Sequence, residues 1–154
     1  PGFDGGVVQP VATAAQLREE LVAEAADVIS YRWAAWGDEY ADVTGDVVWS
    51  EDRQEGYMTL SGLPVNDPNR EQYQLWIVES SRGVPLETPP VDGGVFDIPD
   101  RGEFVVPIRA ALPASGVVAF GLTLEPAGGV VVSDQTRRVV IAAAPADAEP
   151  SNPE

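Results

Sequence analysis

Short stretches in which apolar and polar residues alternate recur along the chain from Val43 onward, and they restrict the fold more than any other sequence feature. A period of two residues places the apolar side chains on one face of a β-strand. The alternating stretches are 47–50, 57–62, 103–109, 118–125 and 139–141, and turn-forming clusters separate them at 64–68, 89–94 and 126–129. About seven strands at this spacing predict a mainly β protein, an Ig-like antiparallel β-sandwich.

One stretch, YQLWIV at 73–78, is apolar on both faces. A strand with two apolar faces is central in its sheet and covered twice. We expect the second sheet on one face and a helix over 14–29 on the other. Pro107 cannot donate a ladder hydrogen bond, so its strand is predicted to be an edge strand or to carry a bulge.

The helix prediction rests on Thr13 and Gln16, which have the spacing of a capping box, and on the apolar stripe that follows them. The pattern predicts an amphipathic helix of about 15 residues docked on the sandwich. Trp33 and Trp36 follow it, and we expect them to fill the junction between helix and sheet.

The two ends of the chain have a different composition. Residues 1–12 hold three Gly and two Pro and predict a lead-in or linker, whereas residues 145–154 hold three Pro and three acids and predict a disordered tail. Between them we predict one domain, 13–144. The chain begins at Pro1 rather than Met, so we expect an excised or processed segment. No run approaches the roughly 18 apolar residues of a membrane span.

The balance of charge excludes several partners. There are 25 acidic residues and nine basic ones, all Arg, for a formal net charge of -16. Such a chain is repelled by nucleic-acid phosphates and anionic lipid headgroups. His, Cys and Lys are absent, which excludes zinc sites on imidazole or thiolate, His-based triads and Schiff-base lysines. Only carboxylate chemistry and oxygen-ligated cations remain open to such a chain. We expect no cofactor and no enzymatic activity.

Two acidic segments, 37–46 and 92–103, could in principle supply oxygen ligands to a cation. They lack EF-hand spacing, and acids cluster by chance in so acidic a chain, so we interpret both as solvated loops. A pair of carboxylates could also carry out glycosidase-type hydrolysis, so a small carboxylate-dependent hydrolase remains a third, less favoured hypothesis.

Six strings of residues point to a family. They are VVWS at 47–50, QEGYM at 54–58, GLP at 62–64, YQLWI at 73–77, GGVF at 93–96 and TLEPAGG at 123–129. In this order they resemble the C-terminal, extracytoplasmic domain of the anti-sigma-K factor family of bacterial regulators, over most of the chain. The sequence departs from the family at 130–134, VVVSD, where many relatives have Pro-x-Gly.

The resemblance implies a membrane-anchored anti-sigma factor that spans the inner membrane once. A cytoplasmic part, absent from this chain, would sequester an extracytoplasmic-function sigma factor, and regulated proteolysis would release it. This domain would lie on the periplasmic side as a regulatory or sensor domain, with an envelope protease or sensor protein as a possible partner. Its only link to the membrane would be an upstream transmembrane helix.

The family supplies no catalytic residues, and we interpret its recurrent residues as structural. They are Trp49, Gly62, Pro64, Tyr73, Leu75, Trp76, Gly94, Glu125, Pro126, Gly128 and Gly129. The alternative to an anti-sigma factor is a free-standing envelope module that binds carbohydrate or peptide. Its platform, or a partner surface, would be formed by exposed aromatic residues, for which Tyr31, Trp36 and Tyr40 are the candidates.

Overall fold

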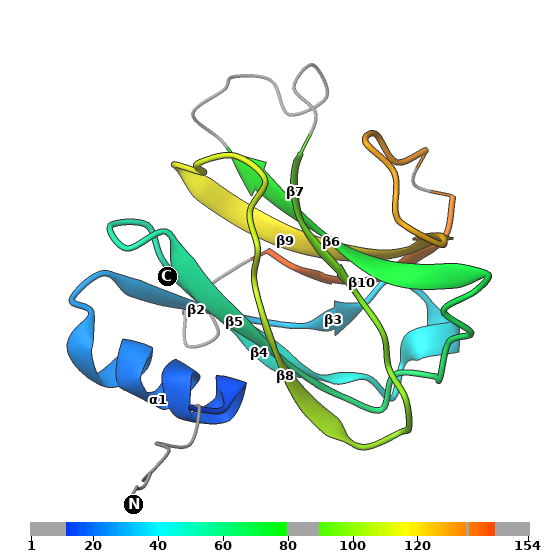
Figure 1. Ribbon diagram of the computed structural model, residues 1–154, viewed down its shortest axis with the longest axis horizontal. Coiled ribbons are helices and arrows are strands. Elements are labelled where there is room, and N and C mark those ends of the chain that lie inside the picture. The colour runs from blue at the N-terminus through cyan, green and yellow to red at the C-terminus, as the bar shows by residue number, and fades with distance from the viewer. Residues whose placement is uncertain (1–11, 80–89, 135, 144–154) are drawn as a thin grey trace, which may run out of the picture.

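Two antiparallel sheets pack face to face in the computed structural model (Figure 1), which describes residues 12–79, 90–134 and 136–143. One sheet has four strands in the order β2 (Val28–Arg32), β4 (Thr44–Ser50), β5 (Glu55–Ser61) and β8 (Glu103–Pro107). The other has five, in the order β3 (Ala34–Ala35), β10 (Arg138–Ala142), β9 (Val117–Pro126), β6 (Glu71–Glu79) and β7 (Val91–Phe96). The predicted mainly β sandwich is confirmed.

The capping box is also confirmed, but the helix is shorter than predicted. In α1 (Ala14–Glu24) the backbone N–H of Gln16 donates to Thr13 Oγ1 at 3.1 Å, and that of Thr13 donates to Gln16 Oε1 at 2.8 Å. The predicted continuation of the helix over residues 25–29 was wrong, because Val28 and Ile29 belong to β2. As β-branched residues they fit a pleated strand, where they pair with β4 and Ile29 packs against the core.

The position of α1 also differs from the prediction. It packs on the outer face of the four-stranded sheet, beneath the sandwich in Figure 1, and not on β6. Leu21 is buried there against Val48 and Tyr57, and Arg18 forms an ion pair with Asp46 at 2.8 Å. A link of three residues joins α1 to β2. The helix can therefore reach only the four-stranded sheet, to which β2 belongs, and not β6 in the other sheet.

Because α1 lies there, the two tryptophans do not fill a helix–sheet junction. Trp33 is buried in the core between the sheets and donates its Nε1–H to the carbonyl oxygen of Thr59 at 3.1 Å. Trp36 lies on the surface and is 47% exposed. The core itself is built around Phe120, whose ring meets Tyr31 and Trp49 edge to face at 5.5 and 6.2 Å.

The central position predicted for 73–78 is confirmed. β6 lies between β9 and β7, and Tyr73, Leu75 and Ile77 point into the core. The edge position predicted from Pro107 is confirmed too. Backbone N–H groups along an edge strand point alternately toward the neighbouring strand and away from it. The N–H of Ile108 points toward β5, because it donates to the carbonyl oxygen of Gly56 at 2.9 Å. The nitrogen of Pro107 therefore faces the open edge, where its missing N–H costs no ladder hydrogen bond.

The cluster at 89–94, predicted as a turn, contributes instead to a strand. β7 begins at Val91 and pairs with β6, with a register shift where Gly94 adopts a φ of +116°. Its outer edge is covered, because Arg109 N and Ala111 N donate to the carbonyls of Gly93 and Asp92, each at 2.8 Å.

Neither end of the chain is described in the structure, apart from Ala12 of the predicted lead-in. The lead-in at 1–12 and the tail at 145–154 therefore remain predictions. Among the described residues, no helix is long and apolar enough to cross a membrane.

The docking of α1 can be tested with two neighbouring helix positions. Leu21 is 1% exposed and Val22 is 47% exposed. We expect Leu21→Ala to lower the free energy of unfolding by about 2–4 kcal/mol, because it leaves a cavity between helix and sheet. Val22→Ala should change it by less than about 0.5 kcal/mol. Urea unfolding followed by Trp fluorescence measures both, and equal losses in the two variants would contradict the docking.

Candidate functional site

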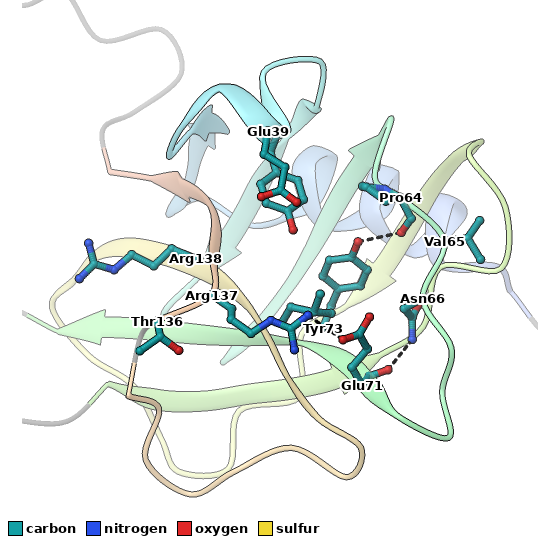
Figure 2. A pocket seen from close by; sticks show the side chains of 11 residues that line it. Glu39, Pro64, Val65, Asn66, Glu71, Tyr73, Thr136, Arg137 and Arg138 are labelled. Carbon is teal, nitrogen blue, oxygen red and sulfur yellow. Dashed lines mark hydrogen bonds and ion pairs between the residues drawn. The ribbon is translucent and has the colours of Figure 1, made fainter.

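A polar pocket of about 350 Å³ opens at one end of the sandwich (Figure 2). This end holds the short helix η1 (Asp38–Tyr40) and the β9–β10 loop, and lies opposite α1 (Figure 1). The pocket is formed by η1, the segment after β5, the start of β6 and the segment leading into β10. The polar pocket is lined by Glu39, Tyr40, Pro64, Val65, Asn66, Glu71, Tyr73, Leu124, Thr136, Arg137 and Arg138.

Two tyrosines lie at the bottom of the polar pocket. Tyr73 points inward from β6, donates its hydroxyl to the carbonyl oxygen of Pro64 at 2.7 Å and stacks on Phe96 at 5.7 Å. Tyr40 comes from η1 and is buried. Burial raises the pKa of both phenols above the usual value of about 10, so at neutral pH both remain protonated hydrogen-bond donors.

An ion pair stands beside the tyrosines. Arg137 Nη2 lies 2.6 Å from Glu71 Oε1, and this bond raises the pKa of the guanidinium, which stays charged. Asn66 holds the backbone of Glu71, since its Nδ2 donates to the carbonyl oxygen of Glu71 at 2.8 Å while its Oδ1 accepts from Ile98 N at 2.7 Å. The side chains of Arg137 and Glu71 are 50% and 31% exposed, so the pair is accessible from solvent.

Arg138, the residue that follows Arg137, does not point the same way. Its side chain leaves the polar pocket (Figure 2), and its guanidinium carbon lies 4.5 Å from the centre of the Trp36 ring. A small apolar hollow of about 90 Å³ adjoins this contact on the outer face of the five-stranded sheet, lined in part by Trp76 and Ile141. Arg137 therefore forms an ion pair, whereas its neighbour Arg138 makes a cation–π contact.

The β9–β10 loop, which leads to Arg137, is fastened to the outer face of β6. Gln74 forms two hydrogen bonds with the backbone of Val130, as donor at 3.0 Å and as acceptor at 2.9 Å. Gln72 accepts from Gly128 N at 2.8 Å. Such paired side-chain bonds to main chain fix a loop that has no strand partner of its own.

A second set of bonds continues along the same face. Trp76 Nε1 donates to Thr123 Oγ1 at 2.9 Å, and Thr123 in turn donates to Glu125 Oε2 at 2.6 Å. Ser133 from the loop donates to the same carboxylate oxygen. The family strings YQLWI and TLEPAGG thus meet along this face of the sheet. We call the side chains that hold the loop there the loop clamp: Gln72, Gln74, Trp76, Thr123, Glu125 and Ser133.

The glycines that follow Pro126 let the chain turn into the loop clamp. Gly128 and Gly129 have φ of +92° and +78°, as the predicted turn requires. The apolar residues after them do not form a strand, and Val131 and Val132 are 89% and 65% exposed.

Several other residues of the family motif are buried, have a constrained backbone or accept a hydrogen bond in the described part of the chain. Trp49, Leu75 and Trp76 are at most 4% exposed. Gly62 has a φ of +88°, and a Cβ there would lie 2.8 Å from the carbonyl oxygen of Asp42. Pro64 supplies the acceptor for Tyr73.

The three aromatic residues predicted as a partner surface are not brought together. Tyr31 is 5% exposed and its hydroxyl donates to Val117 O at 2.9 Å in the core. Tyr40 lies at the bottom of the polar pocket, and only Trp36 presents a ring to solvent. Tyr31 is withdrawn because it lies on the inward face of β2, a strand that the sequence pattern had assigned in part to the helix.

The acidic side chains of 92–103 accept hydrogen bonds from different partners and do not converge on one point. Asp92 accepts from Gly94 N, Asp100 from Gly102 N, and Asp97 from the side chains of Asn66 and Gln72. Within the described ranges, no group of three or more acidic side chains could hold a metal ion.

Sequence reasoning did not identify Glu71, Asn66 or Tyr73 as members of a pocket. The one available signal was the Arg137–Arg138 dipeptide, the only adjacent basic pair in a strongly acidic chain. Nothing in the local sequence around Asn66 or Glu71 indicates that Arg137, 66 residues after Glu71, forms an ion pair with Glu71 in the folded chain.

Comparison with known proteins agrees with the sequence strings. A family model described as "Anti-sigma-K factor rskA, C-terminal" matches residues 5–139. Searches of curated proteins and of solved structures found no match to this chain.

The two turn glycines offer a matched test of the loop clamp. A Cβ at Gly129 would lie 2.6 Å from Val95 Cγ2 and 2.9 Å from Gln74 Oε1, whereas a Cβ at Gly128 would meet nothing within 4 Å. Both Ala variants adopt a disfavoured positive φ, which costs about 1–2 kcal/mol. We expect Gly129→Ala to lose at least about 1 kcal/mol more than Gly128→Ala, from overpacking. Urea unfolding of both variants measures the difference, and equal losses would show that Gln74 does not hold the loop this closely.

Proposed function

The chain belongs to the family of anti-sigma-K factor C-terminal domains, and from that premise we propose that it is the extracytoplasmic regulatory domain of a membrane-anchored anti-sigma factor. The match over residues 5–139 is the observation that carries the proposal, because it covers most of the chain. The sigma factor would be bound by a cytoplasmic part outside this chain, and this domain would control its release.

The arrangement of the domain supports a sensory role. If a membrane segment precedes the chain, α1 is the described element nearest to it in sequence, and η1 and the β9–β10 loop, beside the polar pocket, lie at the other end of the sandwich (Figure 1). A pocket in that position is accessible to envelope molecules. The domain would act either by binding a ligand or partner there, or by shielding the lead-in at 1–12 from a protease.

A free-standing envelope binding module is the second candidate, favoured by the polar pocket and by exposed Trp36. We do not propose the hydrolase alternative. A glycosidase needs a protonated acid facing a second carboxylate across a cleft. Of the two acids in the polar pocket, Glu71 is held in an ion pair with Arg137.

Control of the sigma factor can be tested in cells with one substitution at two positions of the full-length protein. Leu75→Asp places a carboxylate at a fully buried position and should unfold the domain. Val131→Asp makes the same chemical change at a position that is 89% exposed and should leave the fold intact. We expect Leu75→Asp alone to change transcription from a promoter read by the cognate sigma factor. If the folded domain shifts the equilibrium between bound and free sigma factor by 1.4 kcal/mol or more, the change is at least about tenfold. Unchanged transcription in both variants, at equal protein levels by immunoblot, would refute a regulatory role.

The side of the membrane can be tested by labelling, because the chain contains no Cys. Val131→Cys creates an exposed thiol and Ser50→Cys a fully buried one. In spheroplasts that express the full-length protein, a membrane-impermeant maleimide should label Val131→Cys before lysis. Ser50→Cys should react only after unfolding in urea, which shows that the reagent reports on the folded domain. Labelling of Val131→Cys only after lysis would place the domain in the cytoplasm.

A further inference from the structure

The ion pair of the polar pocket sets a donor-only group beside an acceptor-only group. The Arg137 guanidinium carries five N–H donors and no acceptor, and the Glu71 carboxylate only accepts. One contact joins them, between Nη2 and Oε1 at 2.6 Å, and within the described residues no other hydrogen bond is formed by either side chain. Two neighbouring hydroxyl groups on a ligand could therefore bind to the pair, one accepting from Arg137 and the other donating to Glu71.

Both side chains are presented from fixed backbone. Glu71 begins β6, where it pairs with Pro126 and its carbonyl oxygen accepts from Asn66 Nδ2. Arg137 lies next to β10, and its carbonyl oxygen accepts from Leu124 N at 3.0 Å. A binding pair held in this way loses little conformational freedom when a ligand arrives.

The charged pair of the polar pocket can accept a neutral ligand. Glu71 is balanced by Arg137 in the ion pair, and Glu39 is a second acid of the lining. Arg138 turns its guanidinium away onto Trp36. An anion would approach a chain of formal net charge -16. A cation would meet the guanidinium of Arg137. A neutral molecule faces neither penalty.

The walls of the polar pocket combine polar and apolar groups. Val65, which is 56% exposed, and the buried side chains of Tyr40 and Tyr73 all line it. Sugar rings have apolar C–H faces and hydroxyl edges, so they can use both kinds of contact. The volume of about 350 Å³ falls at the lower end of the range of small-molecule pockets, roughly 300–1,000 Å³.

We propose that the polar pocket binds a neutral carbohydrate, one or two sugar units in size, through adjacent hydroxyl groups held between Arg137 and Glu71. This inference names a ligand class for the site that the proposed function treats as sensory. Binding is measured on the isolated 154-residue chain and sigma control in cells, so failure of one can be told from failure of the other.

The test is an NMR titration of the 15N-labelled chain with maltose, cellobiose and N,N′-diacetylchitobiose. Concentrations up to about 10 mM suffice to populate a millimolar site. We expect at least one of these sugars to shift the backbone amides of Val65, Asn66, Glu71 and Arg137. Arg137→Gln should weaken that binding by at least about tenfold, the loss expected for one charge-assisted hydrogen bond.

Arg53→Gln is the matched control. Arg53 forms a surface ion pair with Glu24 at 3.7 Å, and its substitution should leave sugar binding unchanged. Spermidine and citrate serve as the cationic and anionic probes. The proposal is overturned if none of the three sugars shifts the pocket amides, if Arg137→Gln binds as tightly as the parent chain, or if only spermidine or citrate binds there.

Discussion

The burial of β6 on both faces is the constraint on which the rest of this structure depends. Its inward residues, Tyr73, Leu75 and Ile77, form part of the core between the sheets. Its outward residues fasten the β9–β10 loop through the loop clamp. A change of register by one residue would exchange the two sets and expose the core face to the loop. One strand therefore fixes both the stacking of the sheets and the course of the β9–β10 loop, whose described residues pair with no strand.

The polar pocket follows from that arrangement. The loop clamp directs the chain so that Arg137 arrives beside Glu71 at the start of β6, where Asn66 supports the acid from the preceding segment. The residues of the loop clamp thus lie outside the lining of the polar pocket and affect it through the β9–β10 loop. They contribute none of its walls, but they decide where its accessible guanidinium stands.

Sequence patterns predicted the features that depend on neighbouring residues. The capping box at Thr13, the central strand at 73–78, the edge strand at Pro107 and the turn at Gly128 all rest on local stereochemistry. The errors arose where two patterns fit the same residues. Val28 and Ile29 extend a helical stripe, but they also fit a strand, and pairing with β4 decided between the two.

The sequence by itself determined the class of the protein and the chemistry open to it. Its period of two residues requires sheets with one buried face, and its lack of His, Cys and Lys excludes whole groups of sites. Tertiary structure alone decided which side chains meet. It placed α1 on the four-stranded sheet, withdrew Tyr31 into the core and brought Arg137 to an acid 66 residues away. The reason is physical: a local pattern sets which way a side chain points, but only the packing of one sheet on another sets what it points at.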